Sequence, residues 1–413
     1  MTLLAGLFER RTNLEDPRVP LTSSTLAQVL DGGNTSDAGI TVNETKALNI
    51  AAVWRAVNMT AGVASALPLK TYRTGTRARA VVRLLDNPHP DMTAKELWET
   101  VYVHLLLWGN AYLLKVRNPA GMLTWLIPIP PGSVKVGRVK DWEQAGMTSP
   151  KVYEVSGFTD GRTESWTDYE VLHIPGLGYD GTIGLSPVTM ARQSLGTTLA
   201  AERQAGRLWA SGSMLSGILQ TEQRLDQTQA EAVKSRWRQM MSSGRANDIA
   251  VLGSGASFQP ISMPNDDAQF LESRIFQVSE VCRWFGMPPH MNFEVSGSTS
   301  WGSGIEQMTI GWVKYRLAPN WLSRVESRLT KEATPKGVYA EYDPEGLLRG
   351  DSAAQAAFLQ AATGGPWMAG NEARTRLNLE PMDGLDEVLR PLNMAPASQV
   401  EPPSGDPDAD QAA

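Results

Sequence analysis

The chain has 413 residues, of which 42% are hydrophobic, so it can bury at least one full core and has room for two or three domains. Its formal net charge of −6 disfavours a protein that grips nucleic acid by neutralising many phosphates, because that mode of binding needs an excess of basic residues. The single cysteine, Cys282, excludes a disulfide within one chain and favours a reduced, cytosolic environment.

Membrane contact is not expected from this sequence. No apolar run approaches the roughly 18 residues that a spanning helix needs. The apolar stretch at the N-terminus is also too short for the hydrophobic region of a secretory signal, and its arginines follow that stretch instead of preceding it.

The first part of the chain predicts a flexible arm followed by an α+β domain. Residues 1–45 are rich in Thr, Ser, Asn, Asp and Gly, which is typical of a flexible N-terminal arm. A helix is then predicted over 44–66, and Thr93 with Glu96 forms a capping box that opens another helix, which Gly109 closes. Short apolar segments between Pro and Gly turns predict strands at 69–72, 78–82, 111–117, 123–127, 134–136, 152–155 and 171–174.

Two long helices are predicted to enclose a small αβ insertion. Ser186 followed by Pro187 opens the first helix, which continues to about Trp209. The second helix begins at Asn265 and stops at Gly286. Because the chain enters and leaves residues 212–263 through these helices, we expect them to lie antiparallel. Strands are predicted at 217–220, 249–252 and 258–261, with a helix opened by Asp226.

A polar stretch separates the second helix from a further long one. Residues 288–302 are mostly small or polar, and a helix restarts at Ser303, which can form a capping box with Glu306. We therefore predict a mobile loop between two rigid helices. The new helix continues to about Lys331, but Pro319 cannot donate its backbone hydrogen bond, so a helix kink is expected there.

The C-terminal part is predicted to be helical and then disordered. A strand at 338–342 is followed by a helix at 351–362 and another at 371–377 that Asn371 would cap. Residues 395–413 contain Pro, Ala, Ser and four acids without a base, which is typical of a disordered acidic tail.

Motifs for catalysis, cofactors or metals were not found in the sequence. A glycine-rich loop ending in Lys-Ser or Lys-Thr is missing, and so is a G-x-S-x-G nucleophile motif. The four histidines, His89, His104, His173 and His290, do not have the spacing of metal ligands. We expect His104, which lies beside the apolar face of its helix, to be a hydrogen-bonded core residue. No catalytic residue, cofactor or metal site is predicted.

Two alternatives remain open from the residues alone. The Ser/Gly stretch before Ser303 precedes a helix start and could bind an anion through its amides, so a hydrolase or nucleotide-dependent enzyme is a second hypothesis. A group of basic residues in the insertion is either a docking patch or a solvated helix face. This group consists of Arg224, Lys234, Arg236, Arg238 and Arg245.

Several short segments, taken in order, resemble the phage portal proteins of the HK97 type. They begin at Val53-Trp54-Arg55-Ala56-Val57 and include Leu84-Leu85-Asp86-Asn87-Pro88-His89-Pro90, Leu107-Trp108-Gly109-Asn110-Ala111-Tyr112, Gly184-Leu185-Ser186-Pro187, Phe270-Leu271-Glu272-Ser273-Arg274, Phe285-Gly286-Met287-Pro288-Pro289 and Gly370-Asn371-Glu372-Ala373-Arg374. The resemblance extends over roughly residues 46–391 and is carried by the order of the segments more than by any one of them.

This resemblance implies a portal-type fold of the α+β class, which is divided into several parts. The parts are the arm 1–45, a wing at 46–184, a stem helix at 185–211, a clip at 212–263, a second stem helix at 264–287, a channel loop at 288–302, a kinked helix and second wing part at 303–350, a small helical crown at 351–394 and the tail 395–413. The small residues of the first stem helix, such as Gly196, would pack against neighbouring subunits.

The resemblance also implies a function without catalysis. Such proteins form a ring, usually of twelve subunits, at one capsid vertex, through which double-stranded DNA is packaged and ejected without sequence specificity. The implied partners are further copies of the chain, the large terminase, a head-tail adaptor and the major capsid protein or scaffold. The implied location is the virion, with assembly in the host cytoplasm. A head-tail adaptor is a third hypothesis, but such proteins are usually smaller.

Two groups of site residues follow from the resemblance. The DNA-channel loop would contribute His290, Asn292, Glu294, Ser296, Ser298, Thr299, Ser300 and Trp301. The basic residues of the clip would face the terminase and adaptor. An acidic chain around a DNA path repels phosphates, so the duplex would slide through the ring without sticking to it.

Overall fold

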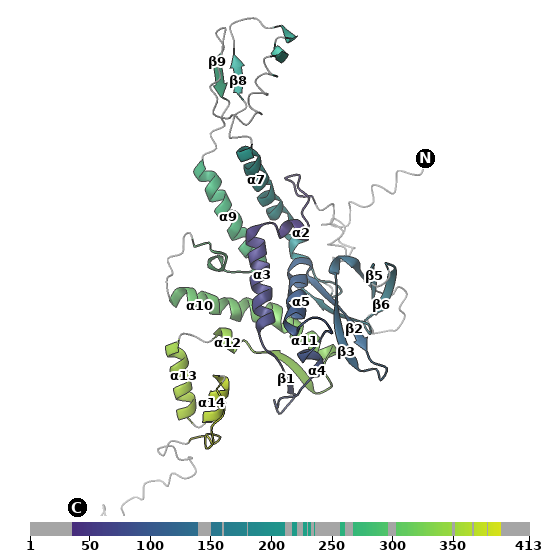
Figure 1. Cartoon of the computed structure of the whole chain (residues 1–413), viewed down its shortest axis with the longest axis vertical. Helices are drawn as coiled ribbons and strands as arrows, with labels where there is room; N and C mark the ends of the chain where they lie inside the picture. The colour runs from purple at the N-terminus through teal and green to yellow at the C-terminus, as the bar shows by residue number, and fades with distance from the viewer. Residues whose placement is uncertain are drawn as a thin grey trace, which may run out of the picture. The chain divides into compact units, whose positions relative to one another are not determined.

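The computed structural model describes residues 35–138, 150–158, 161–179, 181–210, 217–220, 226–228, 230–232, 235, 257–260, 267–295, 303–348, 352–365, 367–377 and 379–389. The chain divides into two compact units, Met1–Asp343 and Pro344–Ala413, whose ribbons are drawn in Figure 1. Helices and strands are both present, as expected for the α+β class. Within the described ranges, no helix has the length and apolar character required to cross a bilayer.

The first unit is built around α3 (Ala51–Ala66), which packs along α5 (Ala94–Trp108). The expected single helix over 44–66 is interrupted: α2 (Glu44–Ala47) ends early, and Ile50 is extended before α3 begins. Asn43 caps α2 by accepting a hydrogen bond from the Lys46 amide at 2.8 Å. The capping box of α5 and its left-handed end at Gly109 are confirmed.

Residues 35–43 pack against other parts of the first unit, although the sequence predicted flexibility up to residue 45. The Asp37 amide donates to Gln193 Oε1 over 2.9 Å. Ser36 is buried, and a side chain at Gly196 would meet Ser36 Oγ at 2.2 Å. Gly196 is therefore used for a contact within the same chain, which corrects the expectation that it packs against a neighbouring subunit.

Three small antiparallel sheets belong to the body of the first unit. β1 (Leu69–Arg73) pairs with β10 (Val338–Tyr342), far away in the sequence. The strand predicted at 78–82 is reduced to a single bridge between Tyr72 and Arg79, and β10 pairs with the opposite edge of β1. A one-turn helix, α4 (Arg83–Asp86), follows.

The other two sheets share one core. β2 (Asn110–Arg117) lies between β3 (Leu123–Ile129) and β7 (Val171–Pro175), and β5 (Lys151–Ser156) lies between β4 (Val134–Arg138) and β6 (Thr163–Thr167), with the short 3₁₀ helix η3 (Pro131–Ser133) between β3 and β4. Tyr112 and Tyr153 meet in the core between these sheets. β6 was not predicted, because Trp166 is its only large apolar residue.

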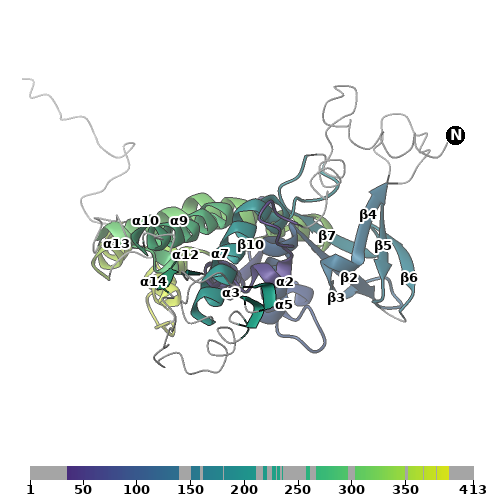
Figure 2. The same ribbon diagram turned by 90° about the horizontal axis from the view of Figure 1, so that it is seen from above.

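The two long helices that flank residues 212–263, called the stalk helices below, lie side by side, as Figures 1 and 2 show. The first begins as α6 (Pro187–Met190), which Ser186 caps through the Thr189 amide at 3.1 Å, and continues after a break at Ala191 as α7 (Arg192–Ala210). The second is α9 (Asp267–Phe285). Between them, β8 (Gly217–Gln220) pairs with β9 (Ser257–Pro260), close to two of the predicted strands, while the predicted strand at 249–252 lies outside the described residues.

The long C-terminal helix of the first unit has three parts. α10 (Ser303–Trp312) leads into a π-helical segment, η5 (Val313–Leu322), and then into α11 (Ser323–Glu332). Pro319 lies inside η5, so the predicted kink site is an irregular helical segment. The Ser323 amide donates to the Ala318 carbonyl five residues earlier, which is the π-helical hydrogen-bond pattern. Such a pattern accommodates Pro319, which has no backbone N–H to donate.

The second unit contains α12 (Glu345–Leu348), α13 (Ser352–Gly364) and α14 (Gly370–Arg376). The prediction that Asn371 caps the last helix is wrong: Ala369 is the N-cap residue, and its amide donates to Glu372 Oε2 at 3.0 Å. Asn371 is buried and bonds to residues further along the chain.

Candidate functional site

The end of α9 is fixed by backbone geometry. Gly286 adopts φ +64°, its amide donates to Arg283 O at 3.3 Å, and the Met287 amide donates to Cys282 O at 2.9 Å. This pair of bonds is a Schellman motif, which needs a residue that tolerates a positive φ. The helix end predicted at Gly286 is therefore confirmed, and it determines where the following segment leaves the helix.

The segment after Gly286 begins as a compact turn. A 3₁₀ helix, η4 (Pro289–Asn292), follows Pro288, and Phe293 adopts φ +58°. The Glu294 amide then donates to Pro289 O at 3.0 Å, which closes the turn. A single turn with this many internal hydrogen bonds has a defined path, so the chain leaves it in a fixed direction.

Three helices hold this turn in place. From α3, Arg55 Nε donates to Met291 O at 2.8 Å, and Ala52 O accepts a hydrogen bond from Asn292 Nδ2 at 3.2 Å. The same Asn292 amide lies 3.4 Å from Cys282 Sγ on α9. From α10, Thr309 Oγ1 lies 3.2 Å from His290 Nε2.

The predicted mobile loop is therefore wrong for its first residues. Met291 is only 7% exposed, and burial lowers the pKa of His290. The prolines restrict the backbone, and Met291 supplies an apolar side chain that enters the core. In contrast, Phe293 is 77% exposed and Val295 is also exposed, so the turn presents apolar side chains at its far end.

The turn also rests on the helix that follows the loop. Trp312 Nε1 donates to Gly286 O at 3.1 Å, and Arg316 Nη2 donates to Phe285 O at 3.4 Å. The Arg316 guanidinium lies 5.4 Å from the Trp321 ring centroid, and burial lowers its pKa. Gly286, Trp312 and Arg316 border a cavity of about 420 Å³ beside the end of α9. Nothing in the sequence pattern identified Arg316, because its partners are backbone carbonyls on another helix.

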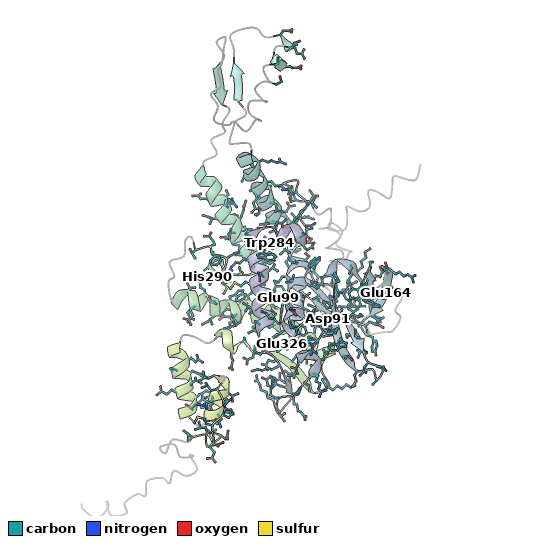
Figure 3. The ribbon with its side chains drawn as sticks, in the orientation of Figure 1. Asp91, Glu99, Glu164, Trp284, His290 and Glu326 are labelled. Carbon is teal, nitrogen blue, oxygen red and sulfur yellow. The ribbon has the colours of Figure 1, made fainter. Side chains whose placement is uncertain are left out.

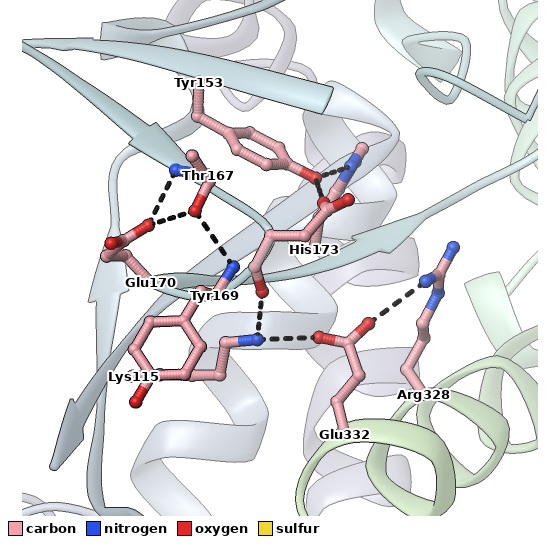
Figure 4. Close-up of polar contacts among 9 residues, drawn as sticks. Lys115, Tyr153, Thr167, Tyr169, Glu170, His173, Arg328 and Glu332 are labelled. Carbon is pink, nitrogen blue, oxygen red and sulfur yellow. Dashed lines mark hydrogen bonds and ion pairs between the residues drawn. The ribbon is translucent and has the colours of Figure 1, made fainter. Parts of the chain in front are cut away.

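A buried ionic network joins α11 to β2, as Figure 4 shows. Lys115 on β2 has a side chain that is only 5% exposed, and its ammonium lies 3.0 Å from Glu332 Oε2 and donates to Asp168 O. Glu332 also accepts from Arg328 Nη1 at 3.2 Å, one turn earlier in α11. The network was not predicted, because Lys115 stands 217 residues from Glu332.

The remaining histidines have structural surroundings. His89 Nδ1 accepts from the amides of Asp91 and Met92, each at 3.0 Å, and His173 Nε2 lies 3.0 Å from Asn110 Oδ1. His104 differs from its prediction: it packs edge-on against Trp108, and its Nδ1 has no hydrogen-bond partner among the described residues. Burial lowers its pKa to about 4. No three potential metal ligands gather within the part of the chain that the structure describes.

Many of the predicted site residues lie outside the described residues. They are Ser296, Ser298, Thr299, Ser300 and Trp301 of the loop, and Arg224, Lys234, Arg236, Arg238 and Arg245 of the clip. The side chain of Ser303, and with it the predicted capping box, is outside as well. Of the loop residues, the structure brings His290 and Asn292 together at the base of the turn and places Glu294 at its end.

Comparison with known proteins agrees with this architecture. The family model for phage portal protein matches residues 51–378. The portal protein of Enterobacteria phage HK97 is 33% identical over 373 residues, covering 87% of this chain and 85% of that protein. The probable portal protein of Streptomyces phage phiC31 is 30% identical over 389 residues, covering 90% of this chain and 84% of that protein.

Solved structures show the same fold. The crystal structure of an HK97 family phage portal protein from Corynebacterium diphtheriae matches with a TM-score of 0.55 at 19% identity and covers 73% of this chain and 95% of that one. A chain from the neck of a native gene transfer agent particle matches with a TM-score of 0.56 at 19% identity and covers 87% of this chain and 99% of that one.

The fold and the anchored turn therefore define a structural protein of the portal class. The chain belongs to the phage portal protein family. Portal proteins are structural, non-enzymatic components of the capsid, so the hypothesis of a hydrolase using the Ser/Gly loop is set aside.

Proposed function

We propose that this chain forms a ring of twelve copies at one capsid vertex and that the ring provides the channel for packaging and ejection of double-stranded DNA. Portal proteins of two phages are its relatives, and a chain that shares its fold lies in the neck of a gene transfer agent particle determined with C12 symmetry. A related neck was determined with C6 symmetry, which is compatible with a twelve-fold ring.

The observation that carries the proposal is the anchored turn at residues 288–295. Its base is bonded to α3, α9 and α10, while Phe293 and Val295 are exposed beyond those anchors. In the ring, residues 288–302 form the channel loop, and His290 and Asn292 hold its base while Glu294 and the residues after it face the DNA. A loop with rigid anchors can adjust to a passing duplex without losing its position.

The charge of the chain supports passage in preference to capture. With a net charge of −6 per copy, a ring repels phosphates, so the duplex slides without the counterion release that holds DNA-binding proteins in place. The loop residues of this chain between 288 and 302 include one acid, Glu294, and no Lys or Arg.

The stalk helices offer a surface for neighbouring copies. A groove of about 650 Å³ runs between α7 and α9 and is bordered by Thr197, Phe276 and Gln277. Phe276 is exposed on α9. An exposed aromatic side chain beside a groove is typical of a subunit contact, so α7 and α9 form the stem through which copies pack around the ring.

The remaining parts follow the same assignment. Residues 46–184 and 303–350 are the wing, 212–263 the clip and 351–394 the crown. The clip, with Arg224, Lys234, Arg236, Arg238 and Arg245, docks the large terminase and then the head-tail adaptor, and the ring contacts the major capsid protein or scaffold. The protein assembles in the host cytoplasm and remains at the portal vertex of the virion.

Negative-stain microscopy of the purified full chain tests the ring. We expect a cyclic particle with an axial hole, and symmetry classification gives the number of copies. A protein that stays monomeric at micromolar concentration across several salt concentrations contradicts the proposal. ATPase and nuclease assays on the same sample should give no turnover, whereas turnover abolished by Ser303→Ala would restore the enzyme hypothesis.

A further inference from the structure

Asn110 is a buried residue at the start of β2, and its side-chain amide makes four hydrogen bonds. Its Nδ2 donates to Trp108 O at 3.1 Å and to Gly184 O at 2.8 Å. Its Oδ1 accepts from the Gly184 amide at 2.6 Å and from His173 Nε2 at 3.0 Å. Two donors and two acceptor sites are all that such an amide has. Asn110 therefore joins the end of α5, β7 and the segment before α6 with its full bonding capacity.

The orientation of this amide is determined by Gly184. Gly184 offers one donor and one acceptor to the same side chain, so an exchange of the nitrogen and the oxygen of Asn110 would place like groups against each other. His173 Nε2 therefore faces an oxygen and carries the proton. Asn110 is 8% exposed and His173 is 2% exposed, so a bond lost here could not be replaced by bulk water.

Three backbone segments approach one another closely around Asn110. A Cβ at Gly184 would lie 2.1 Å from Gly109 O, and a Cβ at Gly176 would lie 2.7 Å from the same oxygen. Both distances are too short for a side chain, so both positions need glycine. Gly109 O also accepts from the Gly176 amide at 2.7 Å. The segments are therefore packed backbone against backbone, which leaves no room for one of them to rotate past another.

Ser186 ties the start of the first stalk helix to the same place. Its hydroxyl donates to Leu107 O in the last turn of α5 at 2.8 Å and accepts from the Thr189 amide in α6 at 3.1 Å. Both partners are backbone groups that a helix end leaves without a bond of its own. One oxygen atom thus links the end of α5 to the beginning of α6. The residues of this junction, called the clasp below, are Gly109, Asn110, His173, Gly176, Gly184 and Ser186.

We propose that the clasp sets the angle at which the first stalk helix leaves the sheet of β2, β3 and β7, and that this angle limits the ring to one number of copies. The inference rests on the ring proposed above. In a closed ring of n copies, each copy is rotated by 360°/n from the next, so rings of twelve and thirteen copies differ by only about 2° per copy. When copies touch along the stalk and along the body that carries the sheet, only one angle between these parts matches a given rotation.

Asn110 and Ser186 are positioning residues in this arrangement. Neither contacts DNA or a neighbouring copy in the proposed ring, and both act through the direction of α6 and α7. A flexible connection at this place would accept a difference of about 2° and allow rings of several sizes. The clasp opposes such bending, because a tilt of α6 has to break a buried hydrogen bond or press backbone atoms together.

The number of copies per ring tests the inference. Full-length Ser186→Ala and Asn110→Ser chains are purified next to the parent, and their rings are sorted by symmetry in electron micrographs. In both variants, we expect the share of rings that differ from the parent's main copy number to rise at least about threefold. The same distribution of sizes in parent and Ser186→Ala overturns the inference and leaves the proposed function intact. This milder variant decides the question where Asn110→Ser does not fold, whereas parent micrographs without rings contradict the proposed function itself.

Thr93→Ala is the matched control. Thr93 caps α5 at its other end, where its hydroxyl accepts from the Glu96 amide at 3.3 Å, so this variant also removes an N-cap from the first unit but leaves the clasp unchanged. Its ring sizes should equal those of the parent, although both alanine variants lower the free energy of unfolding. A similar spread of ring sizes in Thr93→Ala and Ser186→Ala would mean that stability alone sets the ring, which overturns the inference.

A distance measurement reports on the angle directly. Ser165→Cys on β6 and Gln204→Cys on α7, which are both exposed, each take a spin label, while Cys282 is buried. Chains with both cysteines are co-expressed with an excess of chains without them, so that labels in different copies rarely meet. We expect the distribution of distances between the two labels to be about twofold wider in Ser186→Ala than in the parent and unchanged in Thr93→Ala. Equal widths in Ser186→Ala and the parent contradict a role of the clasp in setting the angle.

Discussion

Arg55 of α3 donates from Nε to the carbonyl oxygen of Met291, 236 residues later in the chain, over 2.8 Å. The same guanidinium lies 4.2 Å from the centroid of the exposed Phe293 ring. One side chain thus contacts both the buried and the exposed side of the turn at residues 288–295. The position of this turn therefore depends on α3, a helix far away in the sequence.

Substitution of Arg55 by alanine should loosen this turn. Loss of a charged hydrogen bond and of the contact with Phe293 is expected to lower the free energy of unfolding by about 1–3 kcal/mol. Peptides covering 288–295 should show faster amide exchange while α5 stays protected. Arg203→Ala, which removes an exposed arginine from α7, should change neither quantity. Unchanged exchange at 288–295 in Arg55→Ala would show that other contacts suffice.

The elements that could be predicted from the sequence are those with local causes. The capping box at Thr93 and the left-handed Gly109 determine α5 from within a few residues, and the same holds for the end of α9 at Gly286. β6 was missed because a strand with a single large apolar residue has no alternating pattern. The pairing of β1 with β10 was missed because no local signal connects two segments so far apart.

The site was predicted only in its position along the chain. The breakers Gly286 and Pro288 indicated where the loop begins, but the composition of the segment suggested mobility where the structure has a tethered turn. Met291 was the available signal, because a large apolar residue in an otherwise polar stretch often enters a core. The tethers at Arg55 and Arg316 could not be inferred, because both bind backbone carbonyls that any sequence provides.

Alanine at Gly109 should be far more costly than alanine at Gly75. Both glycines have positive φ, +68° and +88°, which costs an L-residue about 1–2 kcal/mol. A Cβ at Gly109 would also lie 1.9 Å from the backbone oxygen of Leu185, whereas the space around Gly75 is open. We expect a loss of roughly 2–5 kcal/mol for Gly109→Ala, since overpacking adds to the strain. Urea unfolding measures both, and equal losses would contradict the clash.

The ionic network beneath α11 should respond asymmetrically to loss of its members. Glu332→Gln leaves the cations Lys115 and Arg328 without their shared carboxylate, and we expect a loss of about 3–5 kcal/mol. Lys115→Met should cost less, because Arg328 and Glu332 still neutralise each other. Glu341→Gln, in an exposed pair with Arg77, is the matched control and should cost under about 1 kcal/mol. An equal loss for Glu332→Gln and Glu341→Gln in urea unfolding would contradict this account.

Reversal of the charge at the end of the turn should make the proposed channel retain DNA. Glu294→Lys adds a cation to each copy next to the proposed path, so rings should bind double-stranded DNA more tightly at low salt, with affinity that falls steeply as salt is added. Glu164→Lys is the control, because Figure 3 shows Glu164 on the far side of the first unit from His290. Filter binding at several salt concentrations compares them, and an equal gain by both variants would mean that position 294 has no special access to DNA.

Acid should destabilise the first unit partly through His104. Burial lowers the pKa of His104 to about 4 in the folded protein, whereas an unfolded histidine has a pKa near 6.5. The unfolded chain therefore binds a proton first, so the stability from this group is complete above about pH 6.5 and is lost as the pH falls toward about 4. The full loss amounts to about 3 kcal/mol. His104→Gln cannot take up the proton, so its free energy of unfolding should fall less between pH 7 and pH 4.5 than that of the parent in parallel urea titrations. Part of the slope should remain, because burial also lowers the pKa of His173. Parallel curves for parent and variant would mean that His104 is protonated as readily in the fold as in water.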